Sequence, residues 1–460
     1  MGRVRVLIIT SGSTGDVAPY TGVAAYLRDA GVRVTLATHE PFRELVTRAG
    51  VPFQPLPGDL RAVLPQAHGQ DGRSSGTDPR ALVKLMSLAR PHIAALAGGM
   101  TGAVERVRPD ALLLSTLVAP LGYQLAEAYG IPAAGLFPQP LHPTRAFGSV
   151  LVGGRSFGAW GNLALGHLVD AAARTMYTRA VRDLRRSLGL RAIPLRTLEK
   201  AQVAHHPAFH GFSEAVVPRP ADWPPQLKVT GYWWPARPRD WQPPGELTAF
   251  LAAGPPPIHI GFGSMAPGQG SRLTAIVLEA VRRTGERAIL QAGWSGLSAP
   301  PARAQGAARP AHLPTPSPAE AQEMPPAAAQ LPAQPDGDVL SIGAVPHDWL
   351  FPRTAAVVHH AGAGTTAAAL RAAVPAVAVP VLADQPFWAR RLHGLGVAPR
   401  PLPMPALTAD RLADAIRAVR NNPHHAARAE AIAARVGAED GVREILEWLR
   451  RVDAGAAPQG

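Results

Sequence analysis

The sequence predicts an α/β protein with two doubly wound domains, each built around a parallel sheet. Three observations lead to this class. Short apolar runs alternate with segments of helical period, the alternation restarts after a Pro- and Trp-rich stretch near the middle, and each half opens with a strand that runs into a Gly/Ser turn. A chain of 460 residues, 47% of them hydrophobic, is long enough for two such domains.

The first half contains two copies of a strand–helix–strand pattern. Its opening strand is a nearly continuous apolar run, of the kind that is buried on both faces of a parallel sheet. A polar turn follows it, and Gly31 ends the next helix. The elements expected are strand 3–10, helix 17–30, strand 32–38, strand 111–114, helix 121–129 and strand 131–136. Residues 1–225 are therefore assigned to an N-terminal domain.

The second half repeats this pattern after a linker. Residues 226–245 are rich in proline and tryptophan and have no helical period, which favours a linker packed over both halves. The elements expected beyond it are strand 258–262, helix 273–284, strand 287–291, strand 355–359, helix 366–373 and strand 376–381. A C-terminal domain over 246–430 and a final helix and tail over 431–460 complete the chain. Within that domain, 300–336 is dominated by proline and alanine, which predicts a disordered surface insertion.

Composition and charge argue against several classes of protein. Because the chain has 0 Cys, it can have no disulfide, thiolate metal site or cysteine nucleophile. The formal net charge is +13, but the arginines are scattered. This pattern argues against a nucleic-acid partner and favours a solvated basic surface that helps to attract an anionic substrate. Without a recognisable signal peptide, lipidation motif or bilayer-length apolar run, a cytoplasmic protein with no stable membrane insertion is expected.

Three segments place polar residues at the carboxyl ends of expected strands, the edge that faces the ligand crevice in open parallel sheets. The first segment is Gly12-Ser13-Thr14-Gly15-Asp16. Its glycines allow the backbone to approach a ligand closely, and the N-terminus of the following helix favours anions. The position of Asp16 leaves two interpretations open, a helix cap and a functional carboxylate.

The second segment is His359-His360-Ala361-Gly362-Ala363-Gly364-Thr365-Thr366. Backbone amides and hydroxyls at such a turn form a phosphate cradle. The segment also fits a loose dinucleotide fingerprint, with Ala367 and Asp384 at the required spacing. An NAD-dependent oxidoreductase is therefore a competing class, whereas a metal site has no third ligand at a suitable spacing.

The third segment, Asp384-Gln385-Pro386, follows the strand expected at 376–381. A carboxylate and an amide at that edge are suited to hydrogen bonds with the hydroxyl groups of a sugar. A loop cap without a ligand is the alternative interpretation.

Taken together, these segments resemble the sterol-glucosyltransferase and glycopeptide-antibiotic branch of the UDP-glycosyltransferase superfamily. The motifs that carry the resemblance occur in order along nearly the whole chain outside the insertion. They are Gly12-Ser13-Thr14-Gly15-Asp16-Val17-x-Pro19, Ala37-Thr38-His39-x-x-Phe42, Pro55-Leu56-x-Gly58-Asp59, Gly261-Phe262-Gly263-Ser264-Met265, Val345-Pro346-His347-Asp348-Trp349-Leu350-Phe351-Pro352, His360-x-Gly362-x-Gly364-Thr365-Thr366 and Asp384-Gln385-Pro386-Phe387-Trp388.

The resemblance implies a GT-B fold, in which two Rossmann-like domains face each other across a cleft. The first would hold most of the acceptor and the second most of a UDP- or dTDP-hexose, without a metal ion or another cofactor. Asp16 falls where members of the family carry their catalytic base. The residues that the resemblance places around the donor are Ser13, Thr14, Gly263, Ser264, Val345, His347, His360, Gly362, Gly364, Thr365, Asp384 and Gln385.

The resemblance also divides these residues by role. His360 and the glycine turn would hold the diphosphate together with Ser264, and the backbone around Val345 and His347 would hold the base. Asp384 and Gln385 would bind the sugar hydroxyls.

Two positions depart from the family's pattern. Thr14 stands where this branch commonly has arginine, and no aromatic residue lies near Ala344 to stack on uracil, which leaves UDP and dTDP open. Relatives with a histidine base pair it with an acid after a later strand. Here that neighbourhood reads Leu114-Ser115-Thr116, in agreement with an aspartate base that works without a dyad.

The function expected is an inverting glycosyltransferase. It would move a hexose, expected to be glucose, to a hydroxyl of an apolar acceptor such as a sterol, macrolide, polyketide or lipid. An NAD-dependent oxidoreductase and a catalytically inert sugar-nucleotide-binding protein are the alternatives. The sequence does not predict an oligomeric state.

Overall fold

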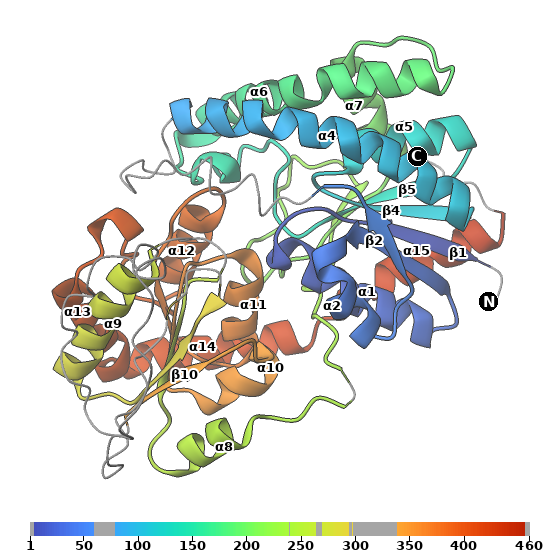
Figure 1. Cartoon of the computed structure of the whole chain (residues 1–460). Helices are drawn as coiled ribbons and strands as arrows, with labels where there is room; N and C mark the ends of the chain where they lie inside the picture. Colours follow the sequence, from blue (N-terminus) through green and yellow to red (C-terminus); the bar gives the residue numbers. More distant parts are fainter. Residues whose placement is uncertain are drawn as a thin grey trace, which may run out of the picture.

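The computed structural model describes residues 4–58, 79–238, 240–263, 269–293, 297 and 338–455. In these residues the chain forms two α/β domains, each built on a parallel sheet with a hydrophobic core on both faces (Figure 1). The sheets have seven and five strands. The fold class expected from the alternation of strands and helices is therefore confirmed.

The sheet of the N-terminal domain places the first strand of the chain near its middle. Its spatial order is β3 (Phe53–Leu56), β2 (Arg33–His39), β1 (Arg5–Ile9), β4 (Ala111–Ser115), β5 (Ala133–Phe137), β6 (Ala208–His210) and β7 (Leu227–Val229). Strand β1 pairs in parallel with β2 on one side and with β4 on the other. The strand order therefore reverses beside β1, and such a switch point opens a crevice at the carboxyl ends of the strands.

Side chains of β1 alternate between two cores, as the period of a strand requires. Val6 and Ile8 pack on the side of α1 (Thr14–Asp29) and α2 (Arg43–Arg48). Leu7 and Ile9 pack on the other side. The helices on that side are α4 (Pro79–Val107), α5 (Ala119–Tyr129), α6 (Gly158–Ser187) and α7 (Leu195–His205).

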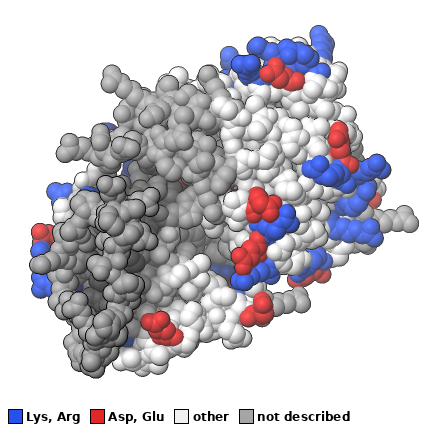
Figure 2. Space-filling view, in the orientation of Figure 1, with Lys and Arg blue, Asp and Glu red and all other residues white. Residues whose placement is uncertain are grey.

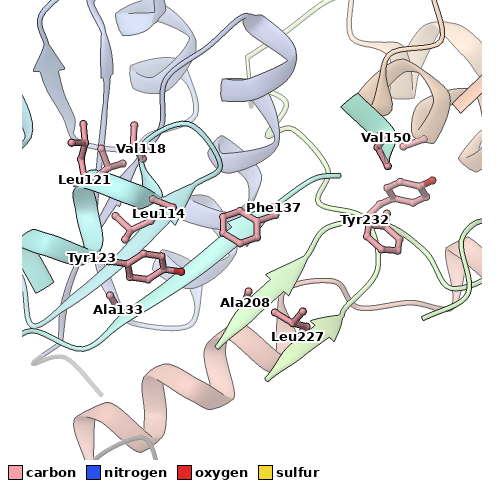
Figure 3. Packing of buried hydrophobic residues seen from close by; sticks show 14 of the residues in the cluster. Leu114, Val118, Leu121, Tyr123, Ala133, Phe137, Val150, Ala208, Leu227 and Tyr232 are labelled. Atoms are coloured by element: carbon pink, nitrogen blue, oxygen red, sulfur yellow. The ribbon is translucent and has the colours of Figure 1, made fainter. Parts of the chain in front are cut away.

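Figure 3 shows part of this second core at close range, with Leu114, Tyr123 and Phe137 beside β4 and β5. The same buried cluster continues past Val150 and Tyr232 to α12 (Gln385–Gly394) of the other domain, where it includes Trp388. The two domains are therefore joined by a continuous apolar contact on this side.

The sheet of the C-terminal domain repeats the arrangement around β8. Its spatial order is β10 (Val339–Ile342), β9 (Ala288–Gln291), β8 (Ile258–Gly261), β11 (Ala356–His359) and β12 (Ala376–Ala378). A second switch point therefore lies between β8 and β11. Helices α9 (Gly270–Thr284) and α13 (Ala409–Asn421) cover one face. Helices α8 (Gly245–Ala252), α10 (His347–Leu350) and α11 (Ala363–Arg371) lie on the other face.

The described part of the chain crosses between the domains twice, and the two crossings contact each other. The first crossing is segment 230–244, and the second joins α14 (Pro423–Gly437) to α15 (Arg443–Asp453). Trp233 Nε1 of the first crossing donates to Gly441 O of the second at 2.8 Å. Helix α15 then packs beside β1, with Trp448 fully buried (Figure 1). The last helix of the chain is thus part of the N-terminal domain's core.

The domain limits differ from those expected in two places. Strand β7 extends the first sheet into 226–245, so the linker begins only at residue 230. A strand of three residues is too short for its alternation to be recognised in the sequence. The limit expected at 430 falls inside α14, which continues across it. The insertion expected at 300–336 lies outside the described residues.

Basic residues are dispersed on the face of the molecule drawn in Figure 2, where several Lys and Arg side chains adjoin Asp or Glu. Pairs one helical turn apart are common, such as Arg48 with Glu44 at 2.7 Å and Arg443 with Glu447 at 3.0 Å. Among the residues that the structure describes, no helix combines the length and the apolar character that crossing a membrane requires.

Candidate active site

Two turns at the switch points lie opposite each other between the domains. The first joins β1 to α1 and contains Ser13 and Asp16, and the second joins β11 to α11 and contains His360 and Gly362. Helix α1 contacts α11, and the charge of Asp16 raises the pKa of Asp384 at the start of α12. Since both turns follow the carboxyl ends of parallel strands, segments far apart in the sequence meet at one site.

Asp16 lies in the first turn of α1 and closes a capping box with Ser13. The amide and the hydroxyl of Ser13 both donate to Asp16 Oδ2, at 2.8 and 2.9 Å. Burial raises the pKa of Asp16, and the two hydrogen bonds lower it in part. Within the described part of the chain, both hydrogen bonds of the carboxylate go to Oδ2, so Oδ1 is left for another donor. Ser13 is therefore the N-cap residue and Asp16 supports the cap from position N3, a role that is compatible with a functional one.

Gly12 determines where that carboxylate lies. Its φ of +144° is one that other residues rarely adopt, and an added Cβ would lie 2.5 Å from Asp16 Oδ2. On the other side of the turn, Thr10 Oγ1 donates to the carbonyl oxygen of Asp16 at 2.7 Å. The turn after β1 is therefore packed around the side chain and the backbone of Asp16.

Asp384 is the acid on the opposite domain. Trp388 Nε1, one turn further along α12, donates to its Oδ2 at 2.9 Å. Burial raises the pKa of Asp384 to about 6, and the negative charge of Asp16 contributes to the rise. The nearby Gln139 side chain, on the segment after β5, lowers the pKa in part. Two carboxyl groups from different domains thus share a partly buried space, which suits a ligand that brings hydroxyl donors.

Gln385 is more constrained than the sequence indicates. Its Oε1 accepts hydrogen bonds from the amides of Val381 and Leu382, at 2.8 and 3.2 Å, and its side chain is buried. The amide oxygen therefore stabilises the turn before α12. Only the Nε2 group is left to donate to a ligand.

His360 connects two turns of the C-terminal domain. An added Cβ would lie 2.9 Å from His360 Cε1 at Gly263 and 2.5 Å from His360 Nε2 at Gly362, so the ring sits between two glycines. Its Nδ1 is buried and has no hydrogen-bond partner among the described residues. Burial lowers the pKa of His360 to about 4. The site therefore holds a neutral imidazole.

The turn after His360 has the geometry of an anion site. Ala361 has φ +61°, a left-handed conformation that costs roughly 1–3 kcal/mol in a residue other than glycine. Gly362 caps α11, and the amides of Gly364 and Thr365 in its first turn have no partner within the helix. A Cβ on Gly364 would meet nothing within 4 Å, so this helix end opens onto free space. Its amides and positive dipole favour a phosphate.

Val345 and His347 lie just beyond β10, beside the same sheet edge. Val345 is buried, and the His347 ring stacks on Phe351 with the ring centroids 4.3 Å apart. His347 Nε2 is 3.3 Å from Gln291 Oε1. Burial lowers the pKa of His347 to about 4, and its charge in turn lowers that of His360. Both side chains are engaged in packing, so a contact to a nucleotide base at this position would come from the backbone.

The remaining predicted residues are Thr14 and Ser264. Thr14 is the exposed first residue of α1, beside the Ser13–Asp16 capping box. Ser264 lies outside the described residues. Within the described ranges, no three His, Asp or Glu side chains are grouped as a metal ion would require.

Sequence reasoning missed two polar residues of the site. Gln139 reaches Asp384, and the Tyr20 hydroxyl donates to Leu136 O at 2.7 Å while the charge of Asp16 raises the pKa of Tyr20. Each carries a recognisable signal. Gln139 is the first polar side chain after a buried strand, and Tyr20 follows Asp16 by four residues, on the same side of α1.

Two family models match the chain, one in each half. The N-terminal domain model of glycosyltransferase family 28 matches residues 6–134. The C-terminal domain model named erythromycin biosynthesis protein CIII-like matches residues 322–451.

Curated relatives of two kinds align with nearly the whole chain. A sterol 3-beta-glucosyltransferase of Arabidopsis thaliana is 33% identical over 95% of this chain, which spans only 64% of that relative. A Neurospora crassa sterol 3-beta-glucosyltransferase is 31% identical over 97% of this chain, which spans 27% of its length. An O-mycaminosyltylonolide 6-deoxyallosyltransferase of Streptomyces fradiae is 33% identical over 97% of both chains.

Solved structures confirm the expected GT-B arrangement of two facing Rossmann-like domains. The calicheamicin glycosyltransferase CalG4 superposes with a TM-score of 0.66 at 16% identity, over 100% of both chains. The glycosyltransferase VinC, in complex with dTDP, gives 0.64 at 19% identity over 98% of this chain and 100% of its own. At these identities the likeness concerns the fold.

Proposed function

Because the chain belongs to the glycosyltransferases of the branch that contains these sterol and macrolide enzymes, we propose that it transfers a hexose from a nucleotide diphosphate sugar to a hydroxyl of an apolar acceptor. Glucose is the sugar proposed, by analogy with the plant relative, and UDP and dTDP are both candidate carriers. The names of the relatives set the range of acceptors, from sterols to macrolides. The dinucleotide-binding interpretation of residues 362–367 has no support among the families matched.

The observation that carries this proposal is the position of Asp16. It lies in the turn at the switch point of the first domain, and its helix α1 contacts α11, which begins at the anion site of the second domain. In the proposed step Asp16 Oδ1 accepts the proton of the acceptor hydroxyl while that oxygen bonds to the anomeric carbon. The bond from this carbon to the diphosphate oxygen breaks, and its electron pair leaves with the diphosphate. Attack from the side opposite the leaving group inverts the anomeric centre.

The donor side of the proposed mechanism is electrostatic. The first-turn amides of α11 and the imidazole of His360 stabilise the charge that develops on the leaving diphosphate, so the scheme requires no metal ion. Asp384 accepts hydrogen bonds from sugar hydroxyls, and the Nε2 group of Gln385 donates one. The backbone at Val345 and His347 holds the base.

The proposal is tested by incubating the protein with UDP-glucose or dTDP-glucose and a panel of sterols, macrolide aglycones, aromatic polyketides and hydroxylated lipids. A product heavier by one hexose is expected by mass spectrometry, with a β-anomeric proton coupling from the α-linked donor. Calorimetric binding of UDP or dTDP without turnover on any acceptor would instead support an inert sugar-nucleotide-binding protein. Binding of NAD in place of these nucleotides would support the oxidoreductase.

A further inference from the structure

The N-terminal end of α6 exposes large apolar side chains on one side. Phe157, Trp160 and Leu168 have 59, 72 and 66% of their surface accessible, the three highest values among large hydrophobic residues in the described part of the chain. At 100° per residue Trp160 and Leu168 lie about 80° apart around the helix, and Phe157 is its N-cap, so the three residues extend over a length of about 16 Å. We call these three residues the α6 patch.

The sequence around the α6 patch is unusual for an exposed helix. Between Arg155 and Asp170 there is no Lys, Arg, Asp or Glu, although this stretch forms the first three turns of a surface helix. Its other exposed side chains are small, apart from His167. Solvent-exposed helices normally carry charges on their outer side, so an apolar outer side indicates a surface that is covered by something else in use.

The structure holds the patch rigidly in place. Asn162 is buried, its Oδ1 accepts a hydrogen bond from the amide of Phe157 at 2.8 Å, and its Nδ2 donates to Arg145 O at 3.1 Å. Trp160 and Phe157 are therefore presented on a fixed helix start, and burial on docking would require little ordering.

Arginines border the patch on the side of the cleft. The Arg145 guanidinium lies 4.1 Å from the Trp160 ring centroid, and that of Arg155 lies 5.7 Å from the ring of Phe157. The charge of Arg155 lowers the pKa of Arg390 on α12, so a third cation lies close by. Within the described residues none of these arginines forms an ion pair, although the charge of Arg145 lowers the pKa of nearby Asp222. A positive rim around an apolar centre is complementary to an anionic lipid surface.

The segment that carries the patch also borders the candidate active site. Gly154, just before α6, packs against Phe387 of α12, and Phe147 contacts the same ring with centroids 5.4 Å apart. Earlier in this segment, Gln139 reaches Asp384. Segment 138–157 therefore has Gln139, beside Asp384, near one end and Phe157 of the patch at the other. Figure 1 shows α6 beside α4 along the outer edge of the N-terminal domain.

We propose that the α6 patch and its arginine rim dock the protein on the surface of an anionic membrane. The aromatic rings would enter the boundary between headgroups and acyl chains, where tryptophan is favoured, and the arginines would bind lipid phosphates. Docking in this place brings the mouth of the cleft to the bilayer, from which an apolar acceptor can enter without crossing water. The docking itself does not depend on the proposed glycosyl transfer.

Vesicle co-sedimentation of the full chain tests the proposal. Wild-type protein is expected to sediment with vesicles of phosphatidylcholine and phosphatidylglycerol, less with pure phosphatidylcholine, and less as salt is raised. The double variant Trp160→Ser, Leu168→Ser should bind the anionic vesicles roughly tenfold or more weakly, because two inserted side chains are lost. Arg145→Gln with Arg155→Gln should remove the preference for anionic lipid. Tyr129→Ser, at an exposed aromatic residue on α5, is the matched control and should bind like wild type.

Three results would overturn the proposal. The first is wild-type protein that stays in solution with every vesicle, and the second is a serine double variant that sediments as well as wild type. The third is a concentration-dependent dimer of the wild type, measured by ultracentrifugation, that is lost in the double variant while vesicle binding is unchanged. The patch would then be an interface between two copies of the chain. Thermal unfolding of each variant controls for folding, and no measurement in this set requires turnover.

Discussion

Replacing Asp16 with asparagine separates the two roles that the structure gives this side chain. Asp16 stands at position N3 of the capping box, where the amide oxygen of asparagine can take the place of Oδ2, which accepts from Ser13 N and Oγ at 2.8 and 2.9 Å. The neutral amide weakens these bonds by about 1 kcal/mol each, but it also avoids the desolvation that raises the pKa of Asp16. The two effects oppose each other, so the Tm of Asp16→Asn should stay within a few degrees of wild type.

Turnover by Asp16→Asn should fall much further than stability. An amide cannot take the proton of the acceptor hydroxyl, and a positioned general base contributes about 10²–10⁴ in rate, or about 3–5 kcal/mol of barrier. The Kd for UDP or dTDP should be unchanged, because the carboxylate acts on the acceptor. Steady-state kcat with a confirmed acceptor and calorimetric Kd measure the two quantities. An Asn variant that turns over like wild type would refute the assignment of Asp16 as the base.

The same substitution also tests whether the two domains meet as the structure shows, without any acceptor. The charge of Asp16 contributes to the pKa of about 6 at Asp384. Asp16→Asn should therefore lower the pKa of Asp384 toward its usual value, which a carbon NMR titration can follow, with Asp384→Asn assigning the signal. An unchanged pKa would mean that the two carboxyl groups are not close in solution.

The remaining predictions concern the donor side, the first turn, pH and the insertion. His360→Ala should weaken binding of UDP by roughly ten- to a hundredfold, which is what the loss of one hydrogen bond to a charged group costs. The control His205→Ala, at an exposed histidine, should leave binding unchanged. Equal calorimetric Kd values for wild type and His360→Ala would remove His360 from the site. Gly12→Ala should lower kcat about as far as Asp16→Asn does, because its Cβ would displace the carboxylate, and wild-type kcat in this variant would contradict that geometry. Burial lowers the pKa of His259 to about 3 from 6.5, so the unfolded chain binds more protons between these values and stability falls as pH is lowered. The Tm of His259→Gln should accordingly decline less on acidification, and a Tm profile as steep as that of wild type would count against it. Deleting 301–335 should leave the Kd for UDP and the Tm nearly unchanged. Residues 292–300 and 336–338 still supply about a dozen residues for the connection between the parallel strands β9 and β10. A Tm lower by many degrees would show that the deleted segment packs against the protein.

The elements that could be predicted from the sequence are those whose pattern is local. Strand β1 is a continuous apolar run, and α5 is periodic and ends at Gly130, which has φ +63° in the structure. Both were expected within two residues of their bounds. Helix α6 was not expected. Its first turns are apolar on the outer side as well, so the sequence shows no clear helical alternation of apolar and polar residues there. Its 30 residues are held by contacts with α4 and α5 that no local pattern reports.

In the candidate site, too, local features could be predicted from the sequence and contacts between distant segments could not. The turns at Asp16, His360 and Asp384 could be found from the sequence, because each follows a recognisable strand. That the charge of Asp16 raises the pKa of Asp384 could not, since this effect depends on how two domains pack. The use of Gln385 Oε1 by two backbone amides was also beyond the sequence, because a side chain that faces a ligand and one that closes a turn share the same motif.

The return of α15 to the first domain determines where proteins of this architecture can be recombined. A chimera that exchanges the donor half through to the chain end would place a foreign α15 against the resident first sheet, where Trp448 packs in the same core as Val6 and Ile8. The domain meant to stay unchanged would then lose part of its own interior. An exchange that ends at Gly437 and keeps the resident residues 438–455 preserves that interior, so the practical boundary of the donor module lies ahead of the last helix.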